Sequence, residues 1–170
     1  MTSAKKNPVG AWRYSPDATD ADTSVSGAVL MGLLAARNAG IEVPDETIDR
    51  AIKYYVSMTG GNGQVGYSGS AGGGSDAVTS IGVLVYSIAR RQELPQRKAA
   101  AKYLVGRSGG DQPGMGAYPG YTHYYRGQAL FQCDVAAWEK WNAAFVKSLK
   151  TMQSKDGSVS GGREIGRAHV

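Results

Sequence analysis

The chain has 170 residues, of which 42% are hydrophobic and 19% are charged, a composition typical of a globular protein large enough for one core. No apolar run approaches the roughly 18 residues that a membrane-spanning helix needs, and the single cysteine excludes a disulfide framework within the chain. The net charge of +5 is mild, and its basic pairs lie in separate polar stretches rather than in one basic stripe. We therefore expect no nucleic-acid partner and no transmembrane segment.

The first residues do not resemble a secretory signal, because no apolar stretch follows Lys5 and Lys6. We expect a cytoplasmic protein, and the sequence leaves peripheral membrane association open.

Apolar periodicity and capping residues predict a chain of helices. The six predicted helices span residues 22–40, 45–58, 76–91, 95–105, 122–133 and 136–153. Asp22 is a good N-cap for the first helix, and Gly40 suits the position just beyond its end. The first and third helices are apolar on nearly every side, which is typical of an inner layer. The second and sixth carry apolar residues along one stripe only, so we expect them to cover the inner helices.

Glycine accounts for 24 residues, about twice its usual share of roughly 7%. A Gly-x-x-x-Tyr element recurs at nearly equal intervals, beginning at Gly10, Gly63 and Gly114. Each element precedes a predicted inner helix, and Thr23-Ser24-Val25 in the first of these helices is similar to Thr79-Ser80-Ile81 in the second. The pattern predicts three helical repeats within one domain, near residues 10–60, 61–108 and 109–156.

Several segments resemble the repeats of the prenyltransferase and squalene-cyclase (terpenoid cyclase-like) superfamily, and of uncharacterised bacterial proteins that carry such repeats. These segments are Gly-Ala-Trp-Arg-Tyr at 10–14, Asp-Thr-Ser-Val-Ser-Gly at 22–27, Tyr-Tyr-Arg-Gly-Gln-Ala at 124–129, Trp-Glu-Lys-Trp-Asn at 138–142 and Gln-Ser-Lys-Asp-Gly-Ser at 153–158. The last one is similar to the start of that family's Q-x-x-D-G-S-W motif, with Val159 in place of the tryptophan.

The resemblance implies an all-α fold, namely a partial α/α toroid made of three helical hairpins of an α/α barrel. Barrels of this family close with more hairpins than three, so we expect the repeat segment, residues 1–163, to be a fragment of a longer protein. Residues 164–170 match the translation of a common sequencing adapter, and we expect them to be a non-native tail.

Two acids invite a catalytic hypothesis. Cyclases that protonate an alkene use a D-x-D-D-T type motif, because a weakly basic alkene needs a protonated carboxyl shielded from water. Asp20 and Asp22 match that motif incompletely. The competing interpretation, which we favour, is that Asp22 caps the first helix, where the positive helix end stabilises its ionised form.

Aromatic side chains give a second candidate site. In an isoprenoid-binding protein, ring faces line the pocket, and the residues that fit this role are Trp12, Tyr14, Tyr67, Tyr124 and Tyr125. The alternative is that these rings fix the loops onto helix ends.

Prenyltransferases of this fold bind zinc through Asp, Cys and His, but Asp134 follows Cys133 here instead of preceding it. His123 lies farther upstream. We therefore predict no metal site and no cofactor.

The sequence favours a non-catalytic repeat scaffold that binds a hydrophobic, isoprenoid-like ligand or a protein partner. The alternative is a terpene cyclase-like enzyme that acts on an isoprenoid, with part of its acidic site outside this chain. The sequence leaves open which of the two is correct.

Overall fold

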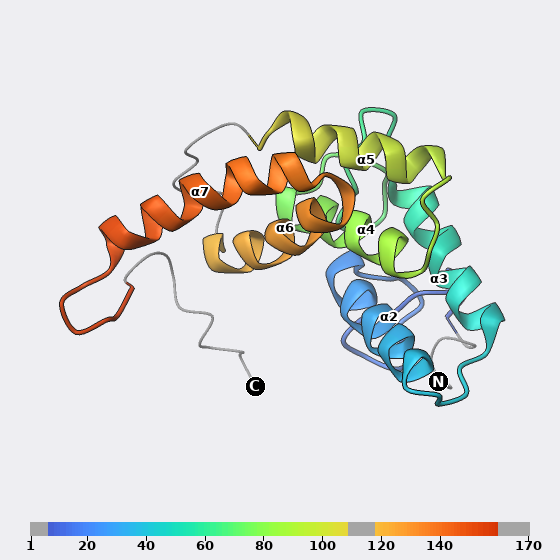
Figure 1. Ribbon diagram of the computed structural model, residues 1–170. Coiled ribbons are helices and arrows are strands. Elements are labelled where there is room, and N and C mark those ends of the chain that lie inside the picture. The colour runs from blue at the N-terminus through green and yellow to red at the C-terminus, as the bar shows by residue number, and fades with distance from the viewer. Residues whose placement is uncertain (1–6, 109–117, 160–170) are drawn as a thin grey trace.

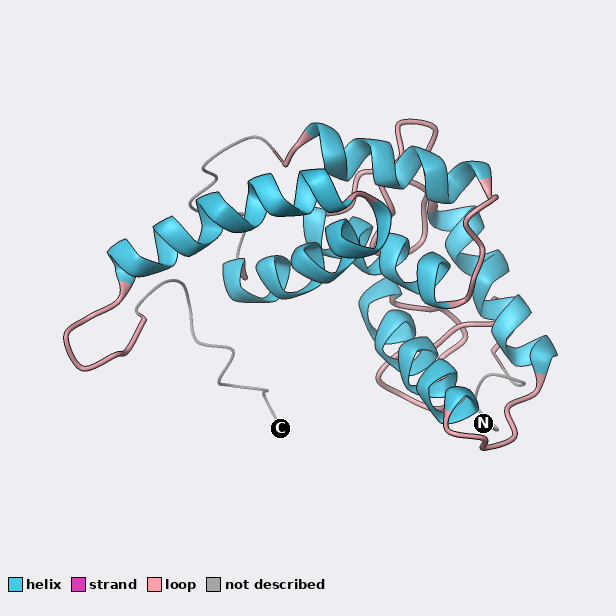
Figure 2. Ribbon diagram, in the orientation of Figure 1, coloured by secondary structure: helices cyan, strands magenta, loops and turns pink. Residues whose placement is uncertain are grey.

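The computed structural model describes residues 7–108 and 118–159, and within them the regular structure is helical (Figures 1 and 2). The helices are α2 (Thr23–Asn38), α3 (Asp45–Met58), α4 (Asp76–Ile88), α5 (Pro95–Gly106), α6 (Pro119–Cys133) and α7 (Val135–Met152). Isolated β-bridges, rather than strands, join short segments after α3 and α7. The described part of the chain thus confirms the all-α prediction.

Two helix boundaries differ from the prediction for local reasons. The helix expected over residues 76–91 ends at Ile88, because Arg90 adopts a left-handed backbone with φ 57° that a helix cannot contain. The helix expected to begin at Thr122 begins at Pro119 instead, since a proline has the φ of a first helical turn and needs no N–H partner there.

Helix α4 is the centre of the fold. It contacts α2, α3, α5 and α6, and every residue from Ala77 to Ser87 is buried. Helices α2, α4 and α6 contact one another in succession, while α3, α5 and α7 contact α2, α4 and α6 respectively. Of the two helices predicted to be apolar on nearly every side, only α4 is enclosed by the described residues, since α2 has five buried residues among its sixteen.

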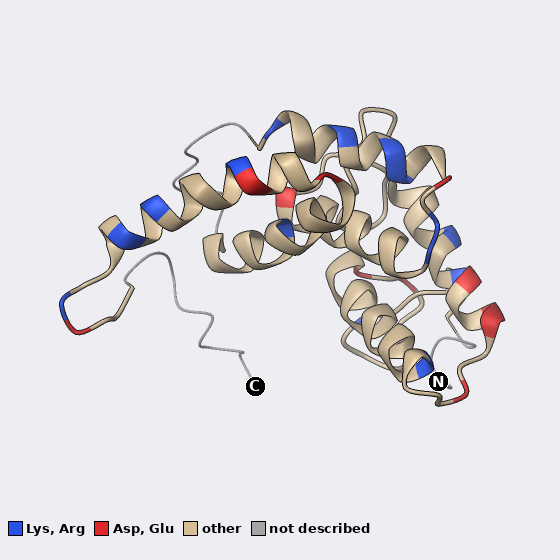
Figure 3. Ribbon diagram, in the orientation of Figure 1, with Lys and Arg blue, Asp and Glu red and all other residues tan. Residues whose placement is uncertain are grey.

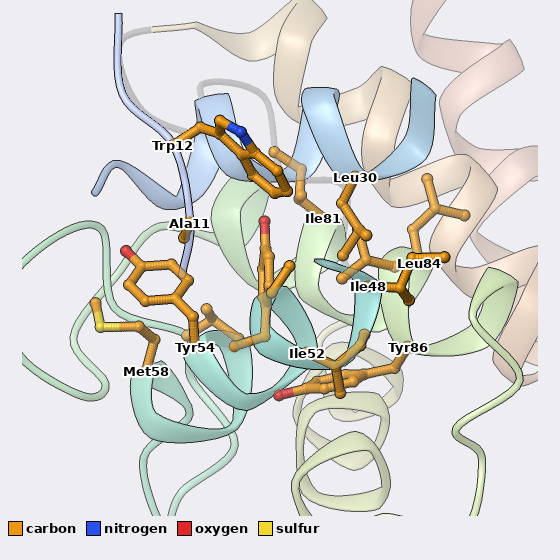
Figure 4. Close-up of a cluster of buried hydrophobic side chains, with 14 of the residues drawn as sticks. Ala11, Trp12, Leu30, Ile48, Ile52, Tyr54, Met58, Ile81, Leu84 and Tyr86 are labelled. Atoms are coloured by element: carbon orange, nitrogen blue, oxygen red, sulfur yellow. The ribbon is translucent and has the colours of Figure 1, made fainter. Parts of the chain in front are cut away.

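Two clusters of buried side chains form the core. The first surrounds Trp12, Leu30 and Ile81, with Tyr54 and Tyr86 at its edges (Figure 4). Its aromatic hydroxyls are satisfied: Tyr54 and Tyr86, for example, lie at hydrogen-bonding distance from the hydroxyls of Thr23 and Thr59. The second cluster joins α4, α5, α6 and α7 around Val83, Leu104, Leu130 and Trp141.

Apart from the end of α2, where Gly40 has the same geometry, the described residues contain the same glycine turn at three places. Gly10 donates to the carbonyl of Asn7, Gly63 to that of Gly60 and Gly157 to that of Ser154, at 3.1, 2.9 and 2.9 Å. The three donor glycines have φ of 74°, 88° and 85°, which side-chain-bearing residues rarely adopt. After α3 the turn is closed by a bridge between Thr59 and Val65, and after α7 by a bridge between Gln153 and Val159.

The first two turns dock onto the next inner helix in the same way. The Trp12 N–H donates to the Ser26 hydroxyl at 2.9 Å, and the Val65 N–H donates to the Thr79 hydroxyl at 3.1 Å. Ser26 is thus the counterpart of Thr79. Pairing Thr23-Ser24-Val25 with Thr79-Ser80-Ile81 would therefore place the two repeats three residues away from this register.

Two features expected from the sequence lie outside the described residues. They are the third Gly-x-x-x-Tyr element, which begins at Gly114, and the tail at 164–170.

Candidate functional site

The Asp22 carboxylate lies at the start of α2 and is almost completely buried, with 2% of the residue exposed. One of its oxygens accepts hydrogen bonds from the backbone N–H of Ser24 at 2.8 Å and of Val25 at 3.1 Å. The Ser24 hydroxyl donates to the same oxygen at 2.5 Å, and the Tyr67 hydroxyl also hydrogen-bonds to this carboxylate. These contacts confirm that Asp22 is the N-cap of α2.

The hydrogen bonds determine the charge of Asp22. Burial raises the pKa of its carboxyl, but the hydrogen bonds from Ser24, Tyr67 and the Val25 N–H outweigh burial, and the net pKa is lowered. The ionised form is therefore stable at neutral pH. A donor that protonates an alkene must hold a proton, so this environment favours the capping role. The catalytic role of Asp20 and Asp22 stays a prediction.

Tyrosines gather beside the capped end of α2 and form what we call the tyrosine cluster. Its members are Tyr67, Tyr121, Tyr124 and Tyr125. Tyr67 belongs to the glycine-rich loop after α3 and hydrogen-bonds to Asp22. Tyr121 belongs to α6 and hydrogen-bonds to Ser24 and Tyr125. Ring centroids are 4.8 Å apart for Tyr121 and Tyr125 and 5.0 Å for Tyr124 and Tyr125, in edge-to-face geometry.

The cluster offers a neutral aromatic surface with hydroxyl groups along its edge. Tyr67 is 49% exposed and Tyr124 is 65% exposed, so both rings are available to a ligand, whereas Tyr125 is buried behind Tyr124. Burial raises the pKa of Tyr121 and of Tyr125, and a hydrogen bond to Asp22 raises that of Tyr67. These phenols are therefore uncharged at neutral pH. Such a surface suits an apolar molecule that carries one hydrogen-bonding group.

The structure brings together only part of the predicted ligand-binding set. Tyr67, Tyr124 and Tyr125 belong to the cluster, and Tyr14 is largely exposed but close enough to Tyr67 to influence its pKa. Trp12 is buried in the first core cluster instead.

Asp20 is separate from the tyrosine cluster. Its carboxylate forms an exposed ion pair with Arg13 at 2.5 Å. It also lines a shallow pocket of about 410 Å³ between the first loop and α3, together with Lys53 and Tyr54. Asp22 is not among the residues that line this pocket.

Tyr121 and Ser24 are members of the site that the predicted set omitted. The four-residue spacing of Tyr121 and Tyr125 places both on one face of a helix, and this signal was present in the sequence. No local signal predicted that Ser24 would meet α6, because the contact joins distant parts of the chain.

His123 and Cys133 lie in different surroundings. His123 stacks on Phe145 with a centroid distance of 4.3 Å, and burial lowers its pKa. Cys133 is half-buried at the end of α6, and burial raises its pKa. Among the described residues, no three His, Cys, Asp or Glu side chains are grouped so that they could hold a metal ion.

The cap predicts a stability effect that depends on pH. We expect Asp22→Ala to lower the free energy of unfolding by about 1–2 kcal/mol near neutral pH, because it removes the cap. Since the pKa of Asp22 is lower in the folded protein than in the unfolded chain, the ionised carboxylate stabilises the fold above the usual aspartate pKa of 3.8. That contribution is lost as the pH falls below this value.

Urea denaturation of the wild type and the variant, from about pH 6 to about pH 3, measures this effect. The difference between the two proteins should shrink towards the acidic end. A difference that stays constant across the series would contradict a lowered pKa.

Among residues 7–108 and 118–159, no helix combines the length and the apolar character that crossing a bilayer requires. The chain matches no protein-family model, no curated protein and no solved structure.

Proposed function

We propose that this chain is a non-catalytic binding scaffold of the prenyltransferase and squalene-cyclase repeat type, and that it holds a hydrophobic ligand against the tyrosine cluster. The observation that carries the proposal is the convergence of the glycine-rich loop after α3, the start of α2 and helix α6 on one neutral aromatic surface. An aromatic surface left half-exposed at the meeting point of three segments is typical of a binding site.

The toroid architecture is part of this proposal. Two features support it: the succession of α2, α4 and α6 with an outer helix on each, and the glycine turn that returns after α7. The first two turns each lead into an inner helix. On this architecture, the turn at Ser154–Gly157 begins another repeat, and the inner helices line a concave surface.

The scaffold role rests on the chemistry of Asp22. Its carboxylate is held ionised by four hydrogen bonds, and this arrangement opposes proton donation to an alkene. Its role at the site is to fix Ser24 and Tyr67 in place.

Calorimetric titration with farnesol tests the proposal, because this prenyl alcohol is apolar and carries one hydroxyl. We expect saturable binding to the wild type. Tyr124→Ala should weaken it by about fivefold to tenfold, the effect of one lost aromatic contact. Phe131→Ala is the control, since Phe131 is also a largely exposed aromatic residue of α6, at 54% against 65% for Tyr124, and it lies two turns farther along the helix, where it packs against Trp138. The affinity of the Phe131→Ala variant for farnesol should stay at the wild-type value.

Three outcomes would overturn the proposal. The first is farnesol binding that both variants weaken equally, and the second is no farnesol binding at all. The third is the formation of a cyclised product when the protein is incubated with squalene or with a prenyl diphosphate, since turnover would establish the cyclase alternative instead.

A further inference from the structure

A pocket of about 410 Å³ lies where the loop before α2, helix α3 and the glycine-rich loop after α3 meet. Three of the residues that line it are buried, namely Ala21, Tyr54 and Met58, and Val9 adds an exposed apolar side chain. The Tyr54 hydroxyl already lies at hydrogen-bonding distance from that of Thr23. These residues therefore offer a ligand mainly apolar surface. The volume suits a small molecule, because ligand pockets in proteins measure about 300–1,000 Å³.

Two of the lining residues carry opposite charges. Asp20 belongs to the loop before α2, and Lys53 belongs to α3. Ser57 lies one turn beyond Lys53 on the same side of α3 and adds a hydroxyl group to the lining. All three residues are exposed, so a ligand can reach them from solvent. The pocket thus combines an anion, a cation and a hydroxyl with an apolar surface.

The charged groups keep binding capacity that the fold does not use. Arg13 Nη1 lies 2.5 Å from Oδ2 of Asp20, and no hydrogen bond with the described residues engages the other oxygen, Oδ1. Lys53 forms no ion pair with the described part of the chain. The Ser57 hydroxyl donates to the Tyr54 carbonyl at 2.7 Å, which leaves its oxygen able to accept a hydrogen bond. One positive and one negative ligand group can therefore both find a partner here.

We propose that this pocket binds a free amino acid with an apolar side chain. The ammonium group of the ligand pairs with Asp20, its carboxylate pairs with Lys53, and its side chain covers the apolar lining. The inference does not depend on the ligand proposed above, because no member of the tyrosine cluster lines this pocket.

The balance of charge favours a zwitterion over an ion of either sign. A ligand with only a carboxylate would bring a second negative charge near Asp20, and a ligand with only an amine would bring a second positive charge near Lys53. An amino acid avoids both repulsions. Figure 3 shows acidic as well as basic positions along α3, so Lys53 is not part of a basic face that would attract a polyanion.

Calorimetric titration of the whole chain with leucine tests the proposal, since leucine carries both charges and an apolar side chain. We expect saturable binding. Three analogues each lack one of these features: 4-methylpentanoate has no ammonium group, isopentylamine has no carboxylate and glycine has no apolar side chain. Each analogue should bind at least about fivefold more weakly than leucine.

Two variants test the charged residues separately. Asp20→Asn and Lys53→Gln each remove one charge but keep a polar side chain, and each should weaken leucine binding about fivefold. The matched controls are Asp17→Asn in the same loop and Lys102→Gln on α5, since both residues are exposed and neither lines the pocket. The affinity of the control variants for leucine should stay at the wild-type value.

Combining a variant with an analogue tests the pairing itself. In Asp20→Asn, the advantage of leucine over 4-methylpentanoate should disappear, because the partner of the ammonium group is gone. An advantage that persists undiminished would contradict the assigned pairing.

Three other results would overturn the proposal. They are no leucine binding by the wild type, an equal loss of affinity in the control variants, and binding of either single-charge analogue as tight as that of leucine. In the last case the pocket would recognise a single charge and not a zwitterion. Because every substituted side chain is exposed, melting temperatures close to that of the wild type should show that the variants fold.

Discussion

Replacing Gly63 by alanine is expected to lower the free energy of unfolding by about 3–5 kcal/mol. Two effects add. Gly63 has φ 88°, a backbone conformation that disfavours any residue with a Cβ atom. A Cβ built there would also lie 2.2 Å from the carbonyl oxygen of Ala99 on α5, and these are backbone atoms that cannot move without displacing the helix. Urea denaturation followed by circular dichroism measures the loss.

Gly61, two residues away in the same turn, provides the matched control. Its φ is not among the positive values, and a Cβ there would meet nothing within 4 Å. We expect Gly61→Ala to change the free energy of unfolding by less than about 0.5 kcal/mol. If both variants proved equally stable, the turn before α4 would not pack against α5 as described.

The helices could be predicted because their signals are local. Asp22 and Ser75 are short polar residues that precede apolar runs, and both cap the helices that follow them. Gly40 has φ 84° just beyond α2, as a glycine that ends a helix should. Each of these signals depends on a few adjacent residues, so a single sequence is sufficient to find them.

The register of the repeat was harder to predict, because two segments with similar sequences need not occupy equivalent positions in the fold. The Thr-Ser-Val and Thr-Ser-Ile tripeptides are alike, yet the hydroxyls that accept from the preceding turn belong to Ser26 and Thr79. The spacing of Gly10 and Gly63 gives the correct register. A position with positive φ accepts few residues other than glycine, so it restricts the sequence more strongly than a position inside a helix does.

The candidate site could be predicted only in part. Its aromatic composition was visible in the sequence, but which rings meet depends on contacts between distant segments. Tyr67 reaches Asp22, and Tyr121 reaches Ser24, only because α6 and the loop after α3 both lie beside the start of α2. Trp12 was proposed for the site on the same ground, its aromatic side chain, but it is buried in the core.

A buried ion pair between α4 and α6 was not predicted, and its disruption is expected to have the other large effect. The Asp76 carboxylate accepts hydrogen bonds from the Tyr103 hydroxyl at 3.0 Å, from Arg107 Nε at 3.1 Å and from Arg126 Nη1 at 3.4 Å. The Arg126 side chain is 1% exposed and that of Asp76 is 11% exposed. Burial lowers the pKa of Arg126, and the Asp76 carboxylate opposes that shift.

Asp76→Ala should therefore lower the free energy of unfolding by about 3–5 kcal/mol, because it leaves a buried guanidinium without the carboxylate that faces it. The control is Asp20→Ala, which removes an ion pair whose side chains are 39% and 66% exposed and should lower stability by less than about 1 kcal/mol.

Adding Arg126→Met to Asp76→Ala should recover part of the loss, since the buried charge is removed as well. Urea denaturation of these proteins gives the coupling energy between Asp76 and Arg126. A coupling near zero would mean that apolar packing alone, and not this charge network, holds α6 against α4.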